Sequence, residues 1–289
     1  VMRCREFYMK DAYSFDIDDI SAKKSYNKMF YSYLKTFQRM ELKAIPMSAE
    51  AGPIGGDLSH EFVILADTGE SKIYADKKIL EINPDSYENK DESLEQMREK
   101  YSEIYAVTDE KFKKEEFDKI VKKENQLKTK GIEVGHIFYF SDKYSKPLNC
   151  SVDSKDGKKT NIKMGSYGIG VSRLVAAVIE AKFENNKMKW PKEISPFDVT
   201  IIPMINKNNK DNLNKAEKLY KELKKQNIDV LLDDTDESMS SKFVKHDLIG
   251  IPNQIIIGSK SINDKFEFKE INGESSVVDL QKIKLKLKN

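Results

Sequence analysis

The last third of the chain alternates strand-like and helix-like segments, and this order constrains the fold more than any other feature. Apolar runs lie at Val199–Pro203, Ile228–Leu232 and Gln254–Ile257. Helical spacing separates these runs, first through Leu213, Ala216, Leu219, Tyr220 and Leu223, then from about Ser240 to Leu248. A βαβαβ order is typical of a mostly parallel sheet. We therefore predict an α/β domain over residues 195–289, after a linker marked by Trp190-Pro191 and Ser195-Pro196.

The preceding residues predict a different, α+β architecture. Met2–Phe15 reads as a strand, and an apolar face recurs at helical spacing from Ala22 to Phe37. Further strands are expected at residues 62–65, 132–140 and 161–164. Between them, residues 68–130 are dominated by lysine, glutamate and aspartate, with helical spacing from Leu94 to Ile104. We predict a core formed by residues 1–67 and 131–194, interrupted by a largely helical insertion with solvated charges.

Composition excludes several classes of protein. Of 289 residues, 39% are hydrophobic and 34% charged, and no apolar run approaches the roughly 18 residues of a membrane span. Cys4 and Cys150 predict a reducing, cytoplasmic setting without disulfides. The three histidines show no zinc-ligand spacing, so no metal site is expected from them. The 50 basic and 48 acidic residues nearly cancel, so any nucleic-acid site must be local.

Three segments carry possible chemistry. The first, GSYGIGVSR at 165–173, is a glycine-rich strand end that opens a helix, with Arg173 just inside it. Such a backbone can approach an anion closely, and an arginine can pair with phosphate. The motif lacks a Walker lysine and a full dinucleotide fingerprint, so close helix–strand packing with Arg173 on the surface remains an alternative.

The second segment is RCREFYMKD at 3–11. In a strand, Arg3, Arg5, Phe7, Met9 and Asp11 share one face. Two arginines, an aromatic ring and a carboxylate suit a nucleotide, with phosphates on the arginines and the base on the ring. A solvated face with Phe7 in the core is the alternative.

The third segment is GGDLSHEF at 55–62. Ser59 and His60 are adjacent, so along a strand they point to opposite faces, and no GxSxG elbow is present. A catalytic triad is therefore not expected. A histidine satisfied in the core or one lining a substrate pocket explains the pattern better.

Together, and in this order, the segments resemble the bacterial-type prolyl-tRNA synthetases, a family of class II aminoacyl-tRNA synthetases. Arg3, Phe7 and Asp11 match the end of class II motif 2, and GSYGIGVSR with Arg173 matches motif 3. The stretches GPIGGDLSHEF, IEVGHIF with KYS behind it, and the closing DDT…KFVKHDLIGIPNQIIIG are also similar. The resemblance covers nearly the whole chain except the charged insertion. It implies an antiparallel class II catalytic sheet followed by an anticodon-binding domain.

The resemblance also implies roles for residues. Arg3 and Arg173 would be the catalytic residues that hold ATP phosphates together with Mg2+, and Phe7 would stack on adenine. The proline pocket would be lined by Met9, Asp11, Tyr13, Ser59, His60, Ser166 and Gly168. Asp11 would receive the secondary ammonium. Activation by attack on the α-phosphorus of ATP needs positioning and charge neutralisation more than a protein nucleophile.

The chain departs from the family in two places. The insertion at 68–130 resembles the reduced form of some relatives, and we expect it not to hydrolyse mischarged tRNA. The chain begins at Val1 without motif 1, the first strand of motif 2 or the Thr-x-Glu segment. We therefore expect a truncated fragment that does not catalyse proline-dependent ATP–pyrophosphate exchange alone.

The expected partners are L-proline, ATP and tRNA(Pro), with a homodimer in the full-length protein and no membrane. In the C-terminal domain, Asp234 and Lys242 are candidates for anticodon contacts, with a plain surface lysine as the alternative for Lys242. A threonyl-type enzyme would be expected to show zinc ligands. A non-catalytic tRNA-binding paralogue is the other alternative, although such a module has no use for Arg3, Phe7, Asp11 and Arg173.

Overall fold

The computed structural model describes residues 3–50, 58–205, 210–271 and 273–288. The chain divides into two compact units, Val1–Ala181 and Lys182–Asn289. The sequence boundary between domains was expected later, at residue 195. Among the described helices, none combines the length and apolarity that a bilayer crossing requires. Residues 55–57 of the GGDLSHEF motif lie outside the described residues.

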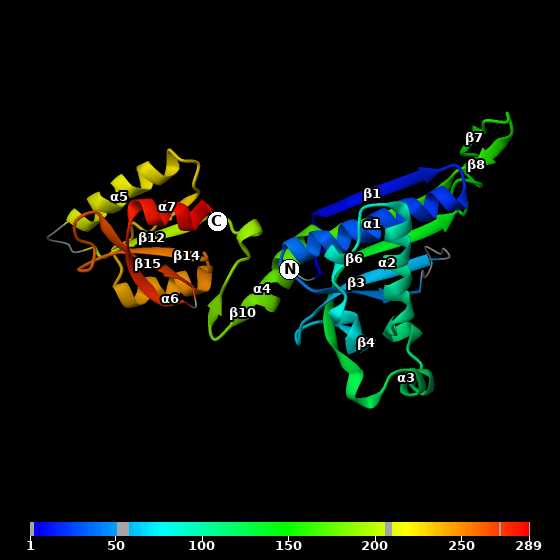
Figure 1. The fold of residues 1–289 in the computed structure, drawn as a ribbon, viewed down its shortest axis with the longest axis horizontal. Helices are drawn as coiled ribbons and strands as arrows, with labels where there is room; N and C mark the ends of the chain where they lie inside the picture. Colours follow the sequence, from blue (N-terminus) through cyan, green and yellow to red (C-terminus); the bar gives the residue numbers. More distant parts are fainter. Residues whose placement is uncertain (1–2, 51–57, 206–209, 272, 289) are drawn as a thin grey trace. The chain divides into compact units, whose positions relative to one another are not determined.

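A seven-stranded, largely antiparallel sheet forms the N-terminal unit, in the order β1-β9-β6-β3-β2-β5-β4 (Figure 1). Its strands are β1 (Met9–Asp16), β2 (Ala44–Ser48), β3 (Leu58–Leu65), β4 (Ser71–Asp76), β5 (Ala106–Thr108), β6 (Gln126–Ser141) and β9 (Lys163–Gly170). Its helices are α1 (Asp19–Arg39), α2 (Asp91–Glu103), α3 (Lys114–Ile120) and α4 (Val171–Lys182). Short 3-10 turns lie at Lys77–Glu81, Pro84–Ser86, Asp109–Lys111 and Lys123–Asn125. The antiparallel core that the sequence predicts is confirmed.

Helix α1 covers one face of this sheet, as the apolar spacing predicts. The carboxylate of Asp18 caps the helix by accepting from the Ser21 amide at 2.7 Å. Tyr26, Phe30 and Phe37 are fully buried, and Phe30 and Phe37 pack against Phe62 of β3. The buried aromatic layer therefore fixes which face of the sheet remains open.

Strand β1 is shorter than the sequence pattern suggested. The pattern predicts a strand from Met2, which lies outside the described residues, but β1 begins at Met9. Among the described strands it pairs with β9 alone, and Met9 pairs with Gly170, the last residue of β9. The chain turns into α4 at Val171. In residues 3–8, the described part of the chain before β1, no residue belongs to a strand, so Arg3 and Phe7 do not continue the face of Met9 and Asp11.

The charged segment 68–130 also differs from the prediction of a largely helical insertion. It contributes the helices α2 and α3, but also β4, β5 and the start of β6. β4 pairs with β6 from Ser71–Gly131 to Asp76–Gln126. The helical spacing from Leu94 to Tyr101 is confirmed in α2, with Leu94, Met97 and Tyr101 buried. The strands were missed because β5 is only three residues long and because lysines, at Lys72, Lys128 and Lys130, occupy exposed positions of β4 and of the start of β6.

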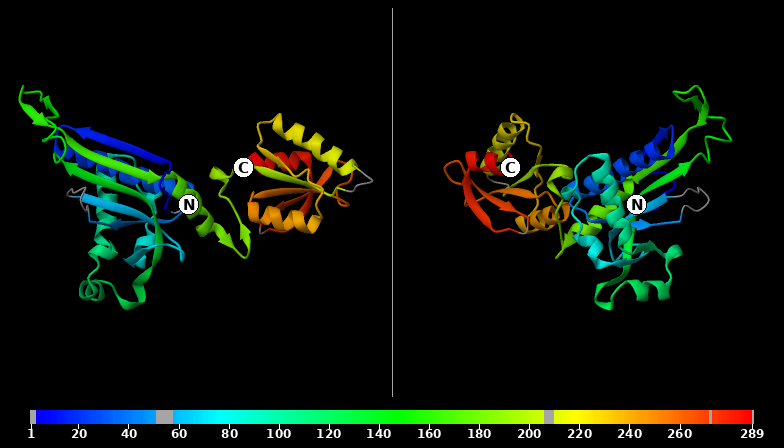
Figure 2. Two further views of the ribbon diagram at one scale, coloured as in Figure 1. Left: turned by 180° about the vertical axis from the view of Figure 1, so that it is seen from behind. Right: turned by 45° about the vertical axis from the view of Figure 1, so that its right-hand side comes forward.

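Beyond β6, a hairpin of β7 (Ser151–Asp153) and β8 (Lys159–Asn161) projects from the sheet (Figure 2). Its turn contains Gly157 at φ +76°, as the Asp156-Gly157 pair predicts. β9 then carries the glycine-rich sequence and leads directly into α4. The sequence expectation of a strand opening an apolar helix is confirmed.

The C-terminal unit contains a five-stranded sheet in the order β13-β12-β14-β15-β16. Its strands are β12 (Val199–Pro203), β13 (Val230–Leu232), β14 (Asn253–Ile257), β15 (Lys265–Glu270) and β16 (Ser275–Asp279). Its helices are α5 (Asp211–Lys224), α6 (Met239–Ile249) and α7 (Leu280–Lys288). Before this sheet lie a hairpin of β10 (Phe183–Glu184) and β11 (Lys187–Met188) and a 3-10 turn at Lys192–Ile194. The three predicted strands are parallel as expected, and β15 and β16 extend the sheet in antiparallel pairing.

The two faces of this sheet differ in chemistry. α5 and α7 cover an apolar face, where Val199, Ile201 and Ile255 are fully buried with residues of both helices. α6 covers the other face (Figure 1), and there the buried side chains include polar ones: Thr200, Asp233, Lys242, His246 and Gln254. The strand alternation places Thr200 and Ile201 on opposite faces.

Candidate active site

The open face of the N-terminal sheet collects most of the predicted site residues. On β1, Met9, Asp11 and Tyr13 are exposed, while the alternate residues turn inward. Asp11 pairs with Gly168 of β9, and Tyr13 pairs with Ser166. Directly paired residues share a face. The period of two thus brings two distant motifs together on the face that α1 leaves open.

Gly168 has no side chain and therefore leaves open space on this face. A Cβ at Gly168 would lie 2.4 Å from the Cε of Met9. Gly168 also pairs with His136 of β6. A side chain here would fill the space between Asp11 and His136, so glycine leaves room for a ligand.

Asp11 presents its carboxylate at the exposed edge of the site. The hydroxyl of Tyr13 donates to Asp11 Oδ2 at 2.7 Å. This hydrogen bond, together with the negative charge of Asp11, raises the pKa of Tyr13. Tyr13 therefore stays protonated and orients a carboxylate that can accept from a ligand ammonium.

His136 was not proposed as a site residue from the sequence, yet it lies at the centre of the open face. Its Nε2 is 2.7 Å from the hydroxyl of Ser59, and its ring stacks on Phe138 with centroids 3.8 Å apart. Its Nδ1 lies 3.6 Å from Glu133 and 3.8 Å from Glu61. The missed signal was alternation, since Ser59 and Glu61 share a face of β3 that Phe138 and His136 continue on β6.

Glu61 and Glu133 bring two carboxylates to the same place. They and His136 have ligand atoms within 4.8 Å of one another. Burial, followed by the negative charges of Glu133 and Glu110, raises the pKa of Glu61 to about 7. Burial also acts on Glu133, but hydrogen bonding and charge from His136 and the charge of Arg173 lower its pKa overall. The pair is thus poised for one shared proton or a cation.

The two predicted phosphate-binding arginines lie in different settings. Arg173, in the first turn of α4, donates from Nη1 to the Glu133 carbonyl at 2.8 Å and lies 3.5 Å from its carboxylate. Arg3 is not on a strand, and its Nε is 2.6 Å from Glu70, with 64% of its side chain exposed. Both positive charges act on Glu133. Phe7, the predicted adenine platform, is 56% exposed ahead of β1.

His60 does not share the open face. It points under α1, where its Nδ1 is 2.6 Å from the Tyr26 hydroxyl and its ring meets Phe30 edge-on. Burial, then the charges of Arg98 and Lys111, lowers the pKa of His60 to about 3. The opposite orientation of Ser59 and His60 is as the sequence predicts. The pocket role expected for His60 is not supported by this position, and the satisfied core histidine describes it better.

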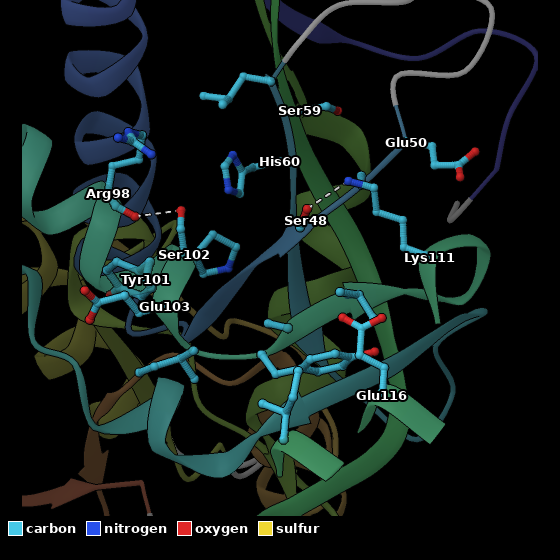
Figure 3. A pocket seen from close by; sticks show the side chains of 18 residues that line it. Ser48, Glu50, Ser59, His60, Arg98, Tyr101, Ser102, Glu103, Lys111 and Glu116 are labelled. Carbon is cyan, nitrogen blue, oxygen red and sulfur yellow. Dashed lines mark hydrogen bonds between the residues drawn. The ribbon is translucent and has the colours of Figure 1, made fainter. Parts of the chain in front are cut away.

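A large cavity of about 880 Å³ lies at the end of β2 and β3, beside α2 and β5. Figure 3 shows His60 between Arg98 and Ser102 on one side and Ser48 and Lys111 on the other. The Lys111 ammonium donates to the Ser48 hydroxyl at 3.0 Å. Among the predicted residues, only Ser59 and His60 line this cavity. Asp11, Glu61, Glu133 and His136, which lie on the open face, do not line it.

The two predicted anticodon residues of the C-terminal unit differ in exposure. Asp234 is exposed, whereas Lys242 is fully buried on the inner face of α6. Its ammonium donates to the carbonyl oxygens of Pro203 and Asp233. The prediction that Lys242 contacts RNA directly does not agree with this burial.

Comparisons with known proteins agree with both units. Residues 1–182 match the family model of the "tRNA synthetase class II core domain (G, H, P, S and T)", and residues 198–289 match that of the "Anticodon binding domain". The chain is 58% identical over 98% of its length to a proline--tRNA ligase of Pelagibacter ubique. Over 93% of its length, it is 50% identical to one of Rhodopseudomonas palustris and 52% identical to one of Bartonella bacilliformis. It spans 64%, 62% and 62% of the lengths of these relatives.

Proposed function

The chain belongs to the class II tRNA synthetases, and from that premise we propose that it serves the ligation of L-proline to tRNA(Pro). The reaction has two steps. The proline carboxylate attacks the α-phosphorus of ATP and releases pyrophosphate, and a ribose hydroxyl at the tRNA 3′ end then displaces AMP from the prolyl-adenylate. The similarity to proline--tRNA ligases over nearly the whole chain supports this substrate.

The observation that carries the proposal is that Asp11 and His136 both pair with Gly168, while Arg173 is held by Glu133 next to His136. Asp11 supplies the exposed carboxylate next to Gly168. It would accept from the secondary ammonium of proline. The apolar side chain of Met9, which approaches the Gly168 position, would face the pyrrolidine ring. Ser59, Ser166, Tyr13 and His136 would complete the pocket, and His136 takes the place first expected for His60.

Positive charge stands where ATP would have to lie. Arg173 is held by Glu133 in the first turn of α4, and Arg3 is exposed near Glu61. A guanidinium pairs with phosphate oxygens through parallel hydrogen bonds. We propose that Arg3 and Arg173 neutralise the phosphates, and that Phe7 stacks on adenine. Such positioning and charge neutralisation are what the reaction requires of the protein.

The carboxylates of Glu61 and Glu133 fit a magnesium ion. Each is held near the other despite like charge, and carboxylates with phosphate oxygens are ligands that Mg2+ accepts. When bound, the ion would supply charge neutralisation to the ATP phosphates. We propose Glu61 and Glu133 as its protein ligands.

The domain proposals follow from the same premise. Residues 1–67 and 131–194 would form the catalytic core, 68–130 a reduced insertion, and 195–289 the anticodon-binding domain. We further propose a cytoplasmic homodimer. Asp234, which is exposed, would contact the anticodon of tRNA(Pro).

Binding of stable adenylate analogues to the full-length protein tests the proposal. Sulfamoyl adenosines carrying proline, threonine or alanine are titrated by calorimetry, with a proline identity tRNA transcript as a separate ligand. The prolyl analogue is expected to bind at least tenfold more tightly than the others. Tighter binding of the threonyl analogue would show that the substrate is threonine and not proline. Tight tRNA binding with no analogue binding would identify a non-catalytic tRNA-binding paralogue.

A further inference from the structure

A lysine is completely buried in the C-terminal unit. Lys242 of α6 has 0% of its side chain exposed. Its Nζ donates to the Pro203 carbonyl at 3.1 Å and to the Asp233 carbonyl at 3.2 Å, and lies 3.6 Å from Asp233 Oδ1. Burying an ammonium is costly unless acceptors surround it. The two carbonyl oxygens accept hydrogen bonds from the ammonium, and the Asp233 carboxylate balances its charge.

The acceptors lie at the ends of two strands. Pro203 is the last residue of β12, and Asp233 directly follows β13. The two strands are parallel neighbours, so their carboxyl ends meet at one edge of the sheet. The ammonium of Lys242 therefore ties the loop after β12 to the loop after β13.

Asp233 extends this tie into its own loop. Its carboxylate, 2% exposed, accepts from the Thr235 amide at 3.1 Å, from Lys245 at 3.1 Å and from His246 Nε2 at 2.8 Å. The hydroxyl of Thr235 donates to it as well. Side chains that are buried thus set the course of a loop whose residues 234–238 are exposed.

The chemistry of this loop favours bases over phosphates. Its exposed residues 234–238 include Asp234, Asp236 and Glu237, which repel phosphate. Carboxylates accept hydrogen bonds from the amino groups of bases. Ligands of open α/β sheets bind outside the carboxyl ends of the strands. Met204, which follows β12, adds a side chain 44% exposed against which a base can pack.

We propose that Lys242 is a positioning residue for anticodon reading: it fixes the loop at 233–238 against the end of β12, so that the acidic loop meets unpaired tRNA bases in one geometry. This inference rests on the proposed function, because it requires tRNA as the partner. It also explains why a lysine suited to RNA by its charge lies inside the domain.

The test compares two tRNA transcripts that differ only in the anticodon, one of proline identity and one with its anticodon bases exchanged. Affinities of the full-length protein are measured by fluorescence anisotropy at one salt concentration. Lys242→Met keeps the apolar stem but removes the charge. We expect Lys242→Met to reduce the preference for the proline transcript over the exchanged one roughly tenfold, which corresponds to about one base contact. The affinity of the variant for the exchanged transcript should stay within twofold of that of the parent protein. Lys224→Met, which removes a half-exposed lysine paired with Asp229, is the matched control and should leave both affinities unchanged.

Equal weakening of both transcripts would reduce Lys242 to a structural role and overturn the proposal, as would an unchanged ratio. If Lys242→Met loses its far-ultraviolet circular dichroism and therefore does not fold, the variant Thr235→Val tests the proposal in its place. That variant removes the loop's hydroxyl bond to Asp233 and leaves the buried cation in place, so the ratio should still fall, and an unchanged ratio would overturn the proposal. A parent protein that does not distinguish the transcripts would instead refute the proposed tRNA partner, and this inference with it.

Discussion

Arg173 Nη1 lies 2.8 Å from the carbonyl oxygen of Glu133 and 3.5 Å from its carboxylate. The first turn of α4 is thereby joined to β6, and the guanidinium is oriented before any ligand binds. The same carboxylate lies 3.6 Å from His136 Nδ1. One glutamate thus connects the proposed phosphate-binding arginine to the proposed proline pocket.

Replacing Arg173 by lysine should weaken nucleotide binding although the charge is kept. Lysine cannot reproduce the planar fork that bonds Glu133 and a phosphate together. We expect the affinity of the full-length protein for the prolyl sulfamoyl adenosine to fall roughly tenfold to a hundredfold, measured by calorimetry. Arg39→Lys, on the exposed end of α1, is the control and should bind like the parent. If Arg173→Lys binds the analogue as tightly as the parent protein, Arg173 does not contact the nucleotide.

Much of this site was predictable because its motifs are local. Alternation placed Met9 and Asp11 together, and the glycine-rich segment was recognised as a strand leading into a helix with Arg173 in its first turn. The start of β1 was not predictable, because it depends on where its partner β9 ends. His136 was missed because its neighbours Ser59 and Glu61 are 77 and 75 positions away, and only strand register joins them.

The burial of His60 and Lys242 was not expected from the sequence for a related reason. Both residue types suit ligands, and a single sequence does not tell which face of an element is covered. α1 covers the face of β3 that carries His60, and Lys242 lies on the face of α6 that packs against the sheet. Polar residues in the interior follow from tertiary packing, which local periodicity does not contain.

Glu61→Gln should change stability in a way that depends on pH. Burial and then the charge of Glu133 raise the pKa of Glu61 from 4.5 to about 7. The folded state therefore prefers the protonated form, and the contribution of this group to stability is complete below pH 4.5 and lost as the pH rises to about 7. Above pH 7 the variant should be more stable than the parent by up to about 3 kcal/mol, with little difference near pH 4.5.

Urea unfolding of the chain at several pH values measures this difference. Glu81→Gln, which replaces an exposed carboxylate in the same unit, should give a small difference that does not vary with pH. A constant difference for Glu61→Gln across this range would contradict the raised pKa.

Tyr26→Phe tests the structural role of His60. The substitution removes the hydroxyl that lies 2.6 Å from His60 Nδ1 and leaves a buried ring nitrogen without its partner. We expect the unfolding free energy to fall by about 1–3 kcal/mol, with analogue affinity unchanged within twofold. Tyr31→Phe, on the same helix but partly exposed, should cost less than about 0.5 kcal/mol. A tenfold loss of affinity for the analogue in Tyr26→Phe would instead show that His60 contributes to the proline pocket.

Gly250→Ala should destabilise the C-terminal unit more than conformation alone requires. Gly250 ends α6 at φ +81°, and a Cβ there would lie 2.8 Å from the Met188 carbonyl oxygen. Gly157 has a similar φ of +76° but open space around it. Gly157→Ala should therefore cost about 1 kcal/mol from backbone conformation, and Gly250→Ala about 3 kcal/mol in its own unit. Equal losses, measured by chemical denaturation of each unit, would show that β11 yields to the added methyl group.

The protein is expected not to hydrolyse alanyl-tRNA(Pro). A pocket for proline rejects the smaller alanine by only about 1–3 kcal/mol, so errors have to be removed somewhere. In segment 68–130, however, β4 and β5 are built into the catalytic sheet, and α2 packs on α1 through Phe30 and Tyr101. Incubation of the full-length protein with alanyl-tRNA(Pro) should leave the ester to decay at the rate without protein, and heat-denatured protein provides that baseline. Rapid deacylation would contradict this prediction. The cavity lined by Arg98 and Lys111 would then be the candidate hydrolytic site, and Lys111→Met should slow the deacylation.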